Sequence, residues 1–291
     1  MNIWQKIEQE ITDKTACSFV IQNKRSVPGG DINQSFCISG GDVKYFVKIN
    51  ASHRLEMFET EISSLTALMQ ANCFIIPRVI VSGMFEQESY LVLEFLELAS
   101  IGNESLFGHK LSQLHSVAAS QFGFEQDNFI GRTVQINPWN ANWGEFFTHN
   151  RLSHQFELLA ENNLKLSSQS QVSDLLKILP DYLNEHNPRP ALVHGDLWQG
   201  NYSYTAEGQP VLYDPAVYYA DHEVDLAMLE LFGAPGENFF ESYCELLMIK
   251  KGYFLRKEIY NLYHILNHAN LFGGGYLRQS EEQIKKILNR I

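Results

Sequence analysis

Three polar side chains in the second half of the chain have the types and the spacing that phosphoryl transfer requires. Asp196 and Asn201 stand in HGDLWQGN with the D-x-x-x-x-N spacing of a kinase catalytic loop, and Asp214 follows in VLYDPA. This reaction needs one carboxylate to orient and deprotonate the acceptor hydroxyl, and amide and carboxylate oxygens to bind magnesium. We therefore expect Asp196 to be the base, and Asn201 and Asp214 to hold Mg²⁺. The alternative is a plain turn at HGD and a strand-capping Asp214.

Three neighbours of this motif have predicted supporting roles. We expect His194 to bond to nearby backbone, because Asp196 already fills the only position that needs a proton acceptor. Trp198, inside the loop, is predicted to stack on or wall the acceptor site, although core packing is nearly as well supported. Asp225, in DHEVDLAML, is predicted to accept hydrogen bonds from the backbone of the catalytic loop and so to hold Asp196 in place.

A loop of small residues upstream could cover nucleotide phosphates. PGGDIN, residues 28 to 33, contains Gly29, Gly30 and Asn33 and joins two predicted strands. Backbone N–H groups can approach phosphates closely there because no side chain intervenes. Alone, the loop favours a plain β-turn, since it fits neither G-x-G-x-x-G nor a Walker sequence.

Lys48 changes that interpretation. It ends the predicted strand KYFVKI, where its ammonium could reach the α- and β-phosphates of a nucleotide. The alternative is a solvated lysine at a strand end. In the helix that follows, Glu61 is the expected ion-pair partner, because it neighbours the apolar face, and Glu59 is the second choice.

The elements that must position these residues are readable from periodicity. Isoleucines four residues apart near the N-terminus predict a short leading helix. Strands are predicted at 18–27, 35–39 and 44–49 and in RVIVSG and SYLVLEFL, one main helix at 54–71, a helical pattern over 103–187, and short β-type runs in ALVHGD and QPVLYD. The fold class is therefore α+β with two lobes. We assign residues 1–98 to a nucleotide-binding N-lobe, and residues 99–291 to a mostly helical C-lobe for catalysis and acceptor binding.

The junction of the two lobes and the C-terminal segment complete the expected site. In YLVLEFLEL the backbone of Glu94, Phe95 and Leu96 could offer its N–H and C=O groups to adenine. The side chains there do not specify adenine, so ATP rather than GTP is an expectation from the fold. YHILNHANLFGGGY carries His268 and Asn270 just before three glycines. We expect this segment, with Asn267, His268 and Asn270, to line the acceptor pocket, whereas a glycine-rich helix C-cap explains only the glycines.

Composition narrows the class of protein. The chain has 291 residues, 45% of them hydrophobic, and a net charge of -12, which argues against a nucleic-acid-binding surface and tolerates cationic small molecules. Its four cysteines form no CxxC pair, so zinc and a disulfide framework are not expected, and a reducing cytoplasm fits. Neither a signal peptide nor a run of 18 apolar residues is visible, so no membrane partner is predicted.

Several segments together resemble the fructosamine kinase (ketosamine-3-kinase) family over nearly the whole chain. HGD-x-x-x-x-N with a following Asp is shared with aminoglycoside phosphotransferases and choline kinases, so it identifies the wider protein-kinase-like group. The narrower resemblance lies in Trp198 of HGDLW, Pro215 of DPA, DNFIG at 127 to 131 and the NHANLFGGGY segment.

The resemblance implies ATP-dependent phosphorylation, with Mg²⁺, of the 3-hydroxyl of a ketosamine such as ribulosamine, erythrulosamine or fructosamine. The partners would be small-molecule ketosamines or glycated protein lysines, and the outcome would be deglycation. One alternative is a kinase of the same architecture acting on another amino alcohol or sugar, as aminoglycoside and choline kinases do. Another is a nucleotide-binding scaffold without transfer activity, which usually lacks one of the carboxylates that are present here.

Overall fold

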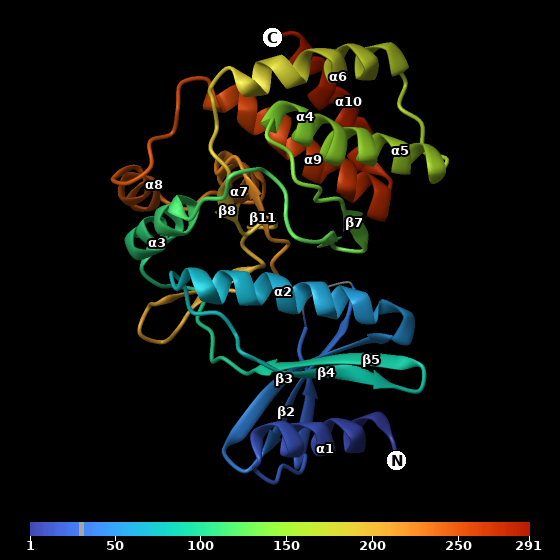
Figure 1. Ribbon diagram of the computed structural model, residues 1–291, viewed down its shortest axis with the longest axis vertical. Coiled ribbons are helices and arrows are strands. Elements are labelled where there is room, and N and C mark those ends of the chain that lie inside the picture. The colour runs from blue at the N-terminus through green and yellow to red at the C-terminus, as the bar shows by residue number, and fades with distance from the viewer. Residues whose placement is uncertain (29–31) are drawn as a thin grey trace.

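The first part of the structure is built around one antiparallel sheet. The computed structural model describes residues 1–28 and 32–291 and is drawn in Figure 1. The sheet has the strand order β1-β2-β3-β5-β4. Its strands β1 to β5 are Asn23–Ser26, Gln34–Gly40, Val43–Ala51, Val79–Phe85 and Glu88–Glu94. Gly29 and Gly30, to which we assigned phosphate contacts, lie outside the described residues.

The first strand is shorter than the predicted 18–27. Two backbone N–H groups in residues 18–22 bond to side chains of the leading helix instead of to a neighbouring strand. Phe19 N–H donates to the Thr12 hydroxyl at 3.0 Å, and Ile21 N–H donates to the Glu8 carboxylate at 2.6 Å. Regular pairing therefore begins only at Asn23, opposite Ser39.

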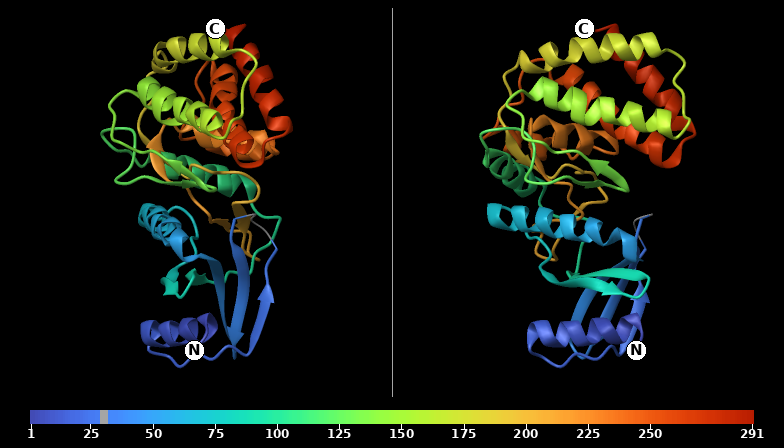
Figure 2. Two further views of the ribbon diagram at one scale, coloured as in Figure 1. Left: turned by 90° about the vertical axis from the view of Figure 1, so that its right-hand side faces the viewer. Right: turned by 45° about the vertical axis from the view of Figure 1, so that its right-hand side comes forward.

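Two helices cover opposite faces of the sheet, the predicted leading helix on one face and the predicted main helix on the other. In α1 (Ile3–Thr15) three isoleucines face inward and pack with alternate residues of β5, Tyr90 and Val92. The intervening residues of β5, Leu91 and Leu93, face the side of α2 (Leu55–Ala71). Figure 2 shows α1 beneath the sheet and α2 between the sheet and the helical part.

The second part of the chain is mostly helical, as predicted. Its helices are α3 Glu104–Ser116, α4 Trp143–Phe147, the π-helical turn η2 Thr148–Ser153, α5 His154–Glu161, α6 Gln169–Asn184, α7 Glu223–Leu231, α8 Glu237–Cys244, α9 Tyr253–Phe272 and α10 Gly275–Leu288. The predicted helical run over 103–187 was wrong at one place. There β6 (Asn128–Ile130) and β7 (Thr133–Gln135) form a hairpin, with Gly131 at a φ of 65° in its turn.

Two further strand pairs hold the loops of the site. β8 (Ala191–Val193) pairs with β11 (Tyr218–Ala220), and β9 (Tyr202–Tyr204) pairs with β10 (Pro210–Leu212). The loop that begins at His194 leaves β8, and Asp214 lies between β10 and β11. Short strands thus fix both ends of the segment that carries the predicted base and metal ligands.

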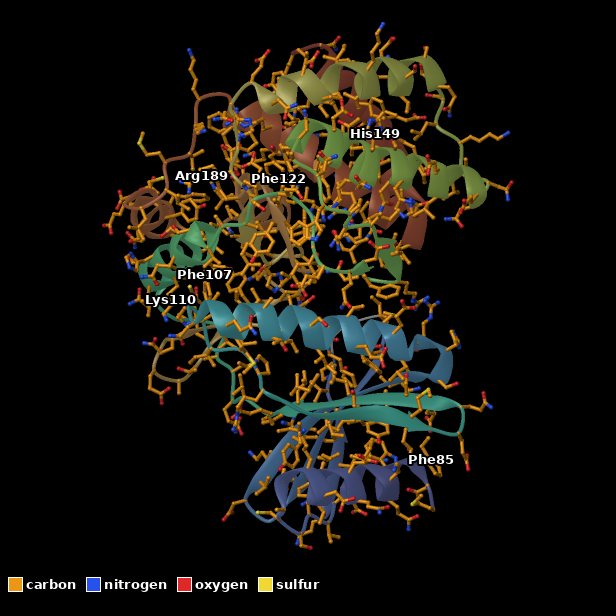
Figure 3. All side chains as sticks on the ribbon, viewed as in Figure 1. Phe85, Phe107, Lys110, Phe122, His149 and Arg189 are labelled. Atoms are coloured by element: carbon orange, nitrogen blue, oxygen red, sulfur yellow. The ribbon has the colours of Figure 1, made fainter. Side chains whose placement is uncertain are left out.

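The large hydrophobic core spans both parts of the chain. Phe58 and Leu65 of α2 belong to the same buried cluster as Phe107 of α3. In Figure 3 Phe107 lies next to α2, while Phe85 lies at the far end of the sheet beside α1. The sheet and the helical part are therefore packed through α2. Over the described residues, no helix combines the length and the apolar character that crossing a membrane requires.

Candidate active site

The predicted catalytic and metal-binding residues converge on one cavity. It has a volume of about 460 Å³ and lies where α2 and β3 meet the loops of the helical part. The residues from our prediction that line it are Asn33, Lys48, Glu61, Asp196, Trp198, Asn201, Asp214 and His268. Side chains separated by up to 235 positions along the chain thus share one space.

Lys48 links the sheet to both the helix α2 and the Asp214 loop. It is only 4% exposed, and its Nζ lies 2.7 Å from Glu61 Oε1 and 2.5 Å from Asp214 Oδ1. Burial opposes the positive charge, but the carboxylates of Asp214 and Glu61 outweigh burial and raise the pKa of Lys48. Lys48 is therefore a buried cation, and its α2 partner is Glu61, whereas Glu59 is exposed.

Asn201 fixes the orientation of Asp196. Its Nδ2 donates to the Asp196 backbone carbonyl at 2.8 Å and to Asp196 Oδ2 at 3.0 Å. Because the amide nitrogen is turned toward Asp196, the Asn201 Oδ1 oxygen is turned away from it. Burial raises the pKa of Asp196 to about 7, against the hydrogen bond from Asn201, which lowers it. A carboxyl with that pKa can accept a proton near neutral pH.

Asp214 has an unusual backbone conformation. Its φ of 54° lies in the left-handed region, where non-glycine residues are uncommon. The N–H of Tyr213 donates to the Asn201 carbonyl at 3.1 Å, so the two predicted metal ligands belong to adjacent, bonded segments. Asp214 Oδ1 is paired with Lys48, and the Asp214 side chain is 47% exposed. One oxygen each of Asn201 and Asp214 thus remains for a hard divalent cation, which prefers such ligands.

Buried hydrogen bonds of His194 and Asp225 hold the backbone of the predicted catalytic loop on the side away from the cavity, as the sequence predicted. His194 Nε2 donates to the Tyr213 carbonyl at 3.0 Å, and its Nδ1 accepts from the Asp196 N–H at 3.3 Å. Burial lowers the pKa of His194, in keeping with a neutral ring. Asp225 accepts from the N–H groups of His194 at 2.7 Å and of Gly195 at 2.9 Å. The loop backbone is thereby tied to α7.

The structure does not place the predicted adenine contacts at this cavity. Glu94, Phe95 and Leu96 are not among the described residues that line it. The N–H of Glu94 donates to the Arg78 carbonyl at 2.8 Å, so it has no proton left for adenine. The Glu94 carboxylate also pairs with Arg78, at 3.0 Å. The N–H of Glu94 is thus used within the sheet, whereas contacts of adenine with the Glu94 carbonyl and with the backbone of Phe95 and Leu96 stay a prediction.

Of the residues predicted to line the acceptor pocket, Trp198 and His268 line the cavity and Asn270 does not. Trp198 is 37% exposed and contacts Phe232, whose ring lies 5.5 Å from His268. The Nδ1 atom of His268 is buried and has no hydrogen-bond partner among the described residues. Asn270, in contrast, does not line the cavity. Its amide donates to the backbone and side chain of Gln155, because it lies on the face of α9 that packs against α5.

Sequence reasoning missed several residues that line the same cavity. They are mainly aromatic side chains, namely Asn128, Phe129, Phe232, His264, Phe272 and Tyr276, whereas Asn267, which also lines the cavity, belongs to the hydrogen-bonding group of the expected segment. The signal was present for two of them, since Phe272 and Tyr276 flank the glycine run. Gly273 and Gly274 have φ values of 64° and 61°, which separate α9 from α10 and set both rings at the cavity.

Comparisons with known proteins agree with this geometry. The family model described as fructosamine kinase matches residues 3–290. A probable ketoamine kinase from Synechocystis sp. is 44% identical over 98% of this chain and 97% of its own. A chloroplastic protein-ribulosamine 3-kinase from Oryza sativa subsp. indica is 37% identical over 86% of this chain and 74% of its own.

Solved structures agree as well. The crystal structure of a putative fructosamine-3-kinase from Haemophilus somnus 129PT superposes with a TM-score of 0.90 at 28% identity, covering 99% of this chain and 100% of that one. The predicted protein-kinase-like fold is thereby confirmed. The chain therefore belongs to the fructosamine kinase family.

Proposed function

We propose that the protein transfers the γ-phosphoryl group of ATP to the 3-hydroxyl of a ketosamine, free or on a glycated protein lysine. The observation that carries this proposal is the convergence of Lys48, Asp196, Asn201 and Asp214 on one cavity in a chain of the fructosamine kinase family. The names of its relatives, ketoamine kinase and protein-ribulosamine 3-kinase, support the acceptor class. The product can break down and release the amine, which is deglycation.

Asp196 acts in this proposal on the acceptor. Its carboxylate accepts the hydroxyl proton while the hydroxyl oxygen bonds to phosphorus and the bond from phosphorus to the departing ADP breaks. The Asn201 amide holds Oδ2 of Asp196, so the carboxylate keeps one orientation. Positioning is the larger contribution, because a loose phosphoryl-transfer transition state leaves little covalent chemistry to the protein.

In this proposal the nucleotide binds at the cluster of Lys48, Glu61 and Asp214. Lys48 is held by Glu61 and Asp214 at the inner end of the cavity, where it would bind phosphate oxygens. Asn201 Oδ1 and Asp214 would hold Mg²⁺, which neutralises charge on the phosphates when bound. We propose residues 1–98 as the nucleotide-binding part and residues 99–291 as the catalytic and acceptor-binding part, with α2 packed against both.

The acceptor lies in this proposal against Trp198 and His268. Both line the cavity together with Asp196, where the sugar would pack against their rings. Aromatic side chains offer flat apolar surface to sugar rings and to the alkyl part of a lysine. Asn270 is not proposed as an acceptor contact.

An acceptor panel tests the proposed function. The protein is incubated with Mg-ATP and, separately, ribulosamine-lysine, fructosamine-lysine, an aminoglycoside and choline, and phosphate transfer is followed by phosphorus NMR. We expect a new phosphate ester with at least one of the two ketosamines, and none with the Asp196→Asn variant. Transfer to the aminoglycoside or choline alone would reject the ketosamine assignment.

A further inference from the structure

A buried relay of side chains connects the catalytic loop to two helices that do not touch the cavity. Asp225, which holds the loop backbone, also accepts a hydrogen bond from His115 Nε2 at 3.1 Å. His115 Nδ1 lies 2.8 Å from the Tyr243 hydroxyl, and the same hydroxyl lies 2.7 Å from His222 Nδ1. The order is Asp225, His115, Tyr243, His222.

The relay joins elements from distant parts of the sequence. His115 lies in the last turn of α3, Tyr243 in α8, and His222 immediately before α7. Figure 1 shows α3 and α8 side by side, with α7 next to them. His115, Asp225 and Tyr243 are buried, at 3%, 1% and 0% exposed. Their polar atoms therefore depend on one another, because water does not reach them.

Each polar contact in the relay can have one donor and one acceptor when all its histidines are neutral. Tyr243 has one hydroxyl proton, so it donates to one histidine and accepts from the other. His115 donates its Nε2 proton to Asp225, whose carboxylate only accepts. Burial favours the neutral form of Asp225, but the hydrogen bonds from His115 and the loop backbone outweigh it and lower the pKa of Asp225. Removing the Tyr243 hydroxyl would leave two ring nitrogens without partners.

His115 is one of three hydrogen-bond donors that orient the Asp225 carboxylate. Oδ2 of Asp225 receives both His115 Nε2 and the N–H of His194, while Oδ1 receives the N–H of Gly195. Gly195 directly precedes Asp196. Without the bond from His115, only the two backbone N–H groups would orient the carboxylate, so the start of the catalytic loop would be held less firmly.

We propose that His115 and Tyr243 are positioning residues for Asp196, acting through Asp225 and the backbone of His194 and Gly195. This inference rests on the proposed function for its kinetic consequence. Neither side chain lines the cavity, so neither would contact ATP or the acceptor. Partners that orient a functional group from behind affect the rate by about 10–100-fold in other sites.

Kinetics with matched variants test this role. We expect His115→Leu to lower kcat by about 10–100-fold, with both KM values within about threefold of the wild type. His115→Gln keeps a donor toward Asp225 and should recover most of kcat, and Tyr243→Phe should fall between them. Equal kcat for the leucine and glutamine variants, or a loss only in KM, would overturn the role.

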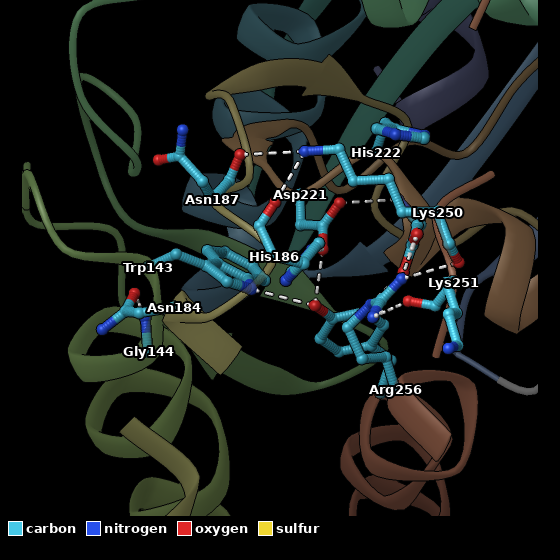
Figure 4. A network of polar contacts seen from close by, with 12 residues as sticks. Trp143, Gly144, Asn184, His186, Asn187, Asp221, His222, Lys250, Lys251 and Arg256 are labelled. Atoms are coloured by element: carbon cyan, nitrogen blue, oxygen red, sulfur yellow. Dashed lines mark hydrogen bonds and ion pairs between the residues drawn. The ribbon is translucent and has the colours of Figure 1, made fainter. Parts of the chain in front are cut away.

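Tyr260→Phe is the control for simply losing a buried hydroxyl. Tyr260 donates to Asp221 Oδ2 at 2.6 Å and accepts from Trp143 Nε1 at 3.0 Å. Figure 4 shows this network of Trp143, His186 and Asp221, which does not include Asp225. We expect Tyr260→Phe to lower thermal stability as Tyr243→Phe does, while kcat stays near the wild-type value. An equal loss of kcat in both would indicate a structural role only.

Backbone hydrogen exchange tests the relay without any substrate. The N–H groups of His194 and Gly195 should exchange faster in His115→Leu and Tyr243→Phe, and at the wild-type rate in His115→Gln and Tyr260→Phe. Unchanged protection in His115→Leu would reject the relay even if the protein phosphorylates ketosamines. An inactive wild type with these exchange changes would instead reject the proposed function and leave the relay supported.

Discussion

At the scale of single residues, each polar atom of Asn201 and Asp214 has a distinct partner or remains for the proposed cation. The amide nitrogen of Asn201 donates hydrogen bonds to Asp196, and one carboxylate oxygen of Asp214 pairs with Lys48. The remaining oxygens are those that the proposed cation would need. The positive φ of Asp214 turns its side chain out of the β10–β11 connection, a strained conformation of the kind found at functional sites.

Replacing the proposed base is the most direct test at this scale. Asp196→Asn preserves size but cannot accept a proton, so we expect kcat to fall by about 10²–10⁴-fold. ATP binding, measured by calorimetry, should persist because Lys48 and Glu61 are unchanged. Asp174→Asn, at an exposed position of α6, is the control and should be fully active. Normal turnover in Asp196→Asn would exclude this carboxylate as the base.

Gly195 has a backbone requirement that can be tested separately from chemistry. Its φ is 83°, and a Cβ would lie 2.0 Å from the Ala216 carbonyl oxygen, whereas Gly41 has a φ of 60° and open space around it. Both alanine variants should lose about 1–2 kcal/mol from the left-handed conformation. Gly195→Ala should lose about 1–3 kcal/mol more from the clash. Urea unfolding measures both, and equal losses would contradict the steric argument.

At the scale of elements, α2 connects the sheet to the helical part. The buried side chains of α2 belong to the core cluster that includes residues of both parts. The Glu61 side chain of the same helix accepts a hydrogen bond from Lys48 on β3. The strand β3 places Lys48 opposite Leu91 of β5 in the middle of the sheet. Lys48 is thus fixed by a central strand and a packed helix, so its position is more rigid than that of a residue on a loop.

The pairing of α2 with β3 predicts the effect of removing one carboxylate. Glu61→Gln leaves Asp214 as the one charged partner of Lys48 among the described residues, and the lysine can then follow the Asp214 loop. We expect affinity for ATP to fall about tenfold, or about 1.4 kcal/mol. Calorimetry with Glu59→Gln as the exposed, matched control checks this expectation. A larger loss in the Glu59 variant would show that the assignment of the ion pair is wrong.

At the scale of the whole molecule, buried histidines make stability depend on pH. Burial lowers the pKa of His264 to about 3, from an ordinary value of 6.5. Between these values the unfolded chain binds a proton that the folded protein excludes. Folding stability is therefore lost as the pH falls below about 6.5. Asp196, whose pKa is raised, has the opposite sign, so single-site differences are needed to isolate His264.

A neutral replacement measures this contribution. His264→Asn cannot titrate, so between pH 7.5 and pH 5.0 it should lose less free energy of unfolding than the wild type, by about 2 kcal/mol. Urea unfolding of both proteins at the two pH values gives this double difference, in which Asp196 and other titrating groups cancel. A difference near zero would mean that His264 is protonated or solvated in the folded protein.

The sequence by itself determined the chemistry and most of the elements. Asp196, Asn201 and Asp214 are recognisable because one short segment supplies all three, and the helix α1 and the sheet strands follow from local periodicity. Glu61 was separable from Glu59 because the buried face of an amphipathic helix can be read from residues three and four apart. These are local properties, and local sequence is sufficient for them.

Only the tertiary structure decided which distant residues meet. It turned Asn270 toward Gln155, brought Phe129 and Phe232 to the cavity, and made a hairpin of β6 and β7, whose three-residue strands are too short for periodicity. It also joined His115 to Tyr243 across 128 positions. Such contacts depend on how helices pack against one another, and packing is set by the combined shape of many side chains, which no single segment contains.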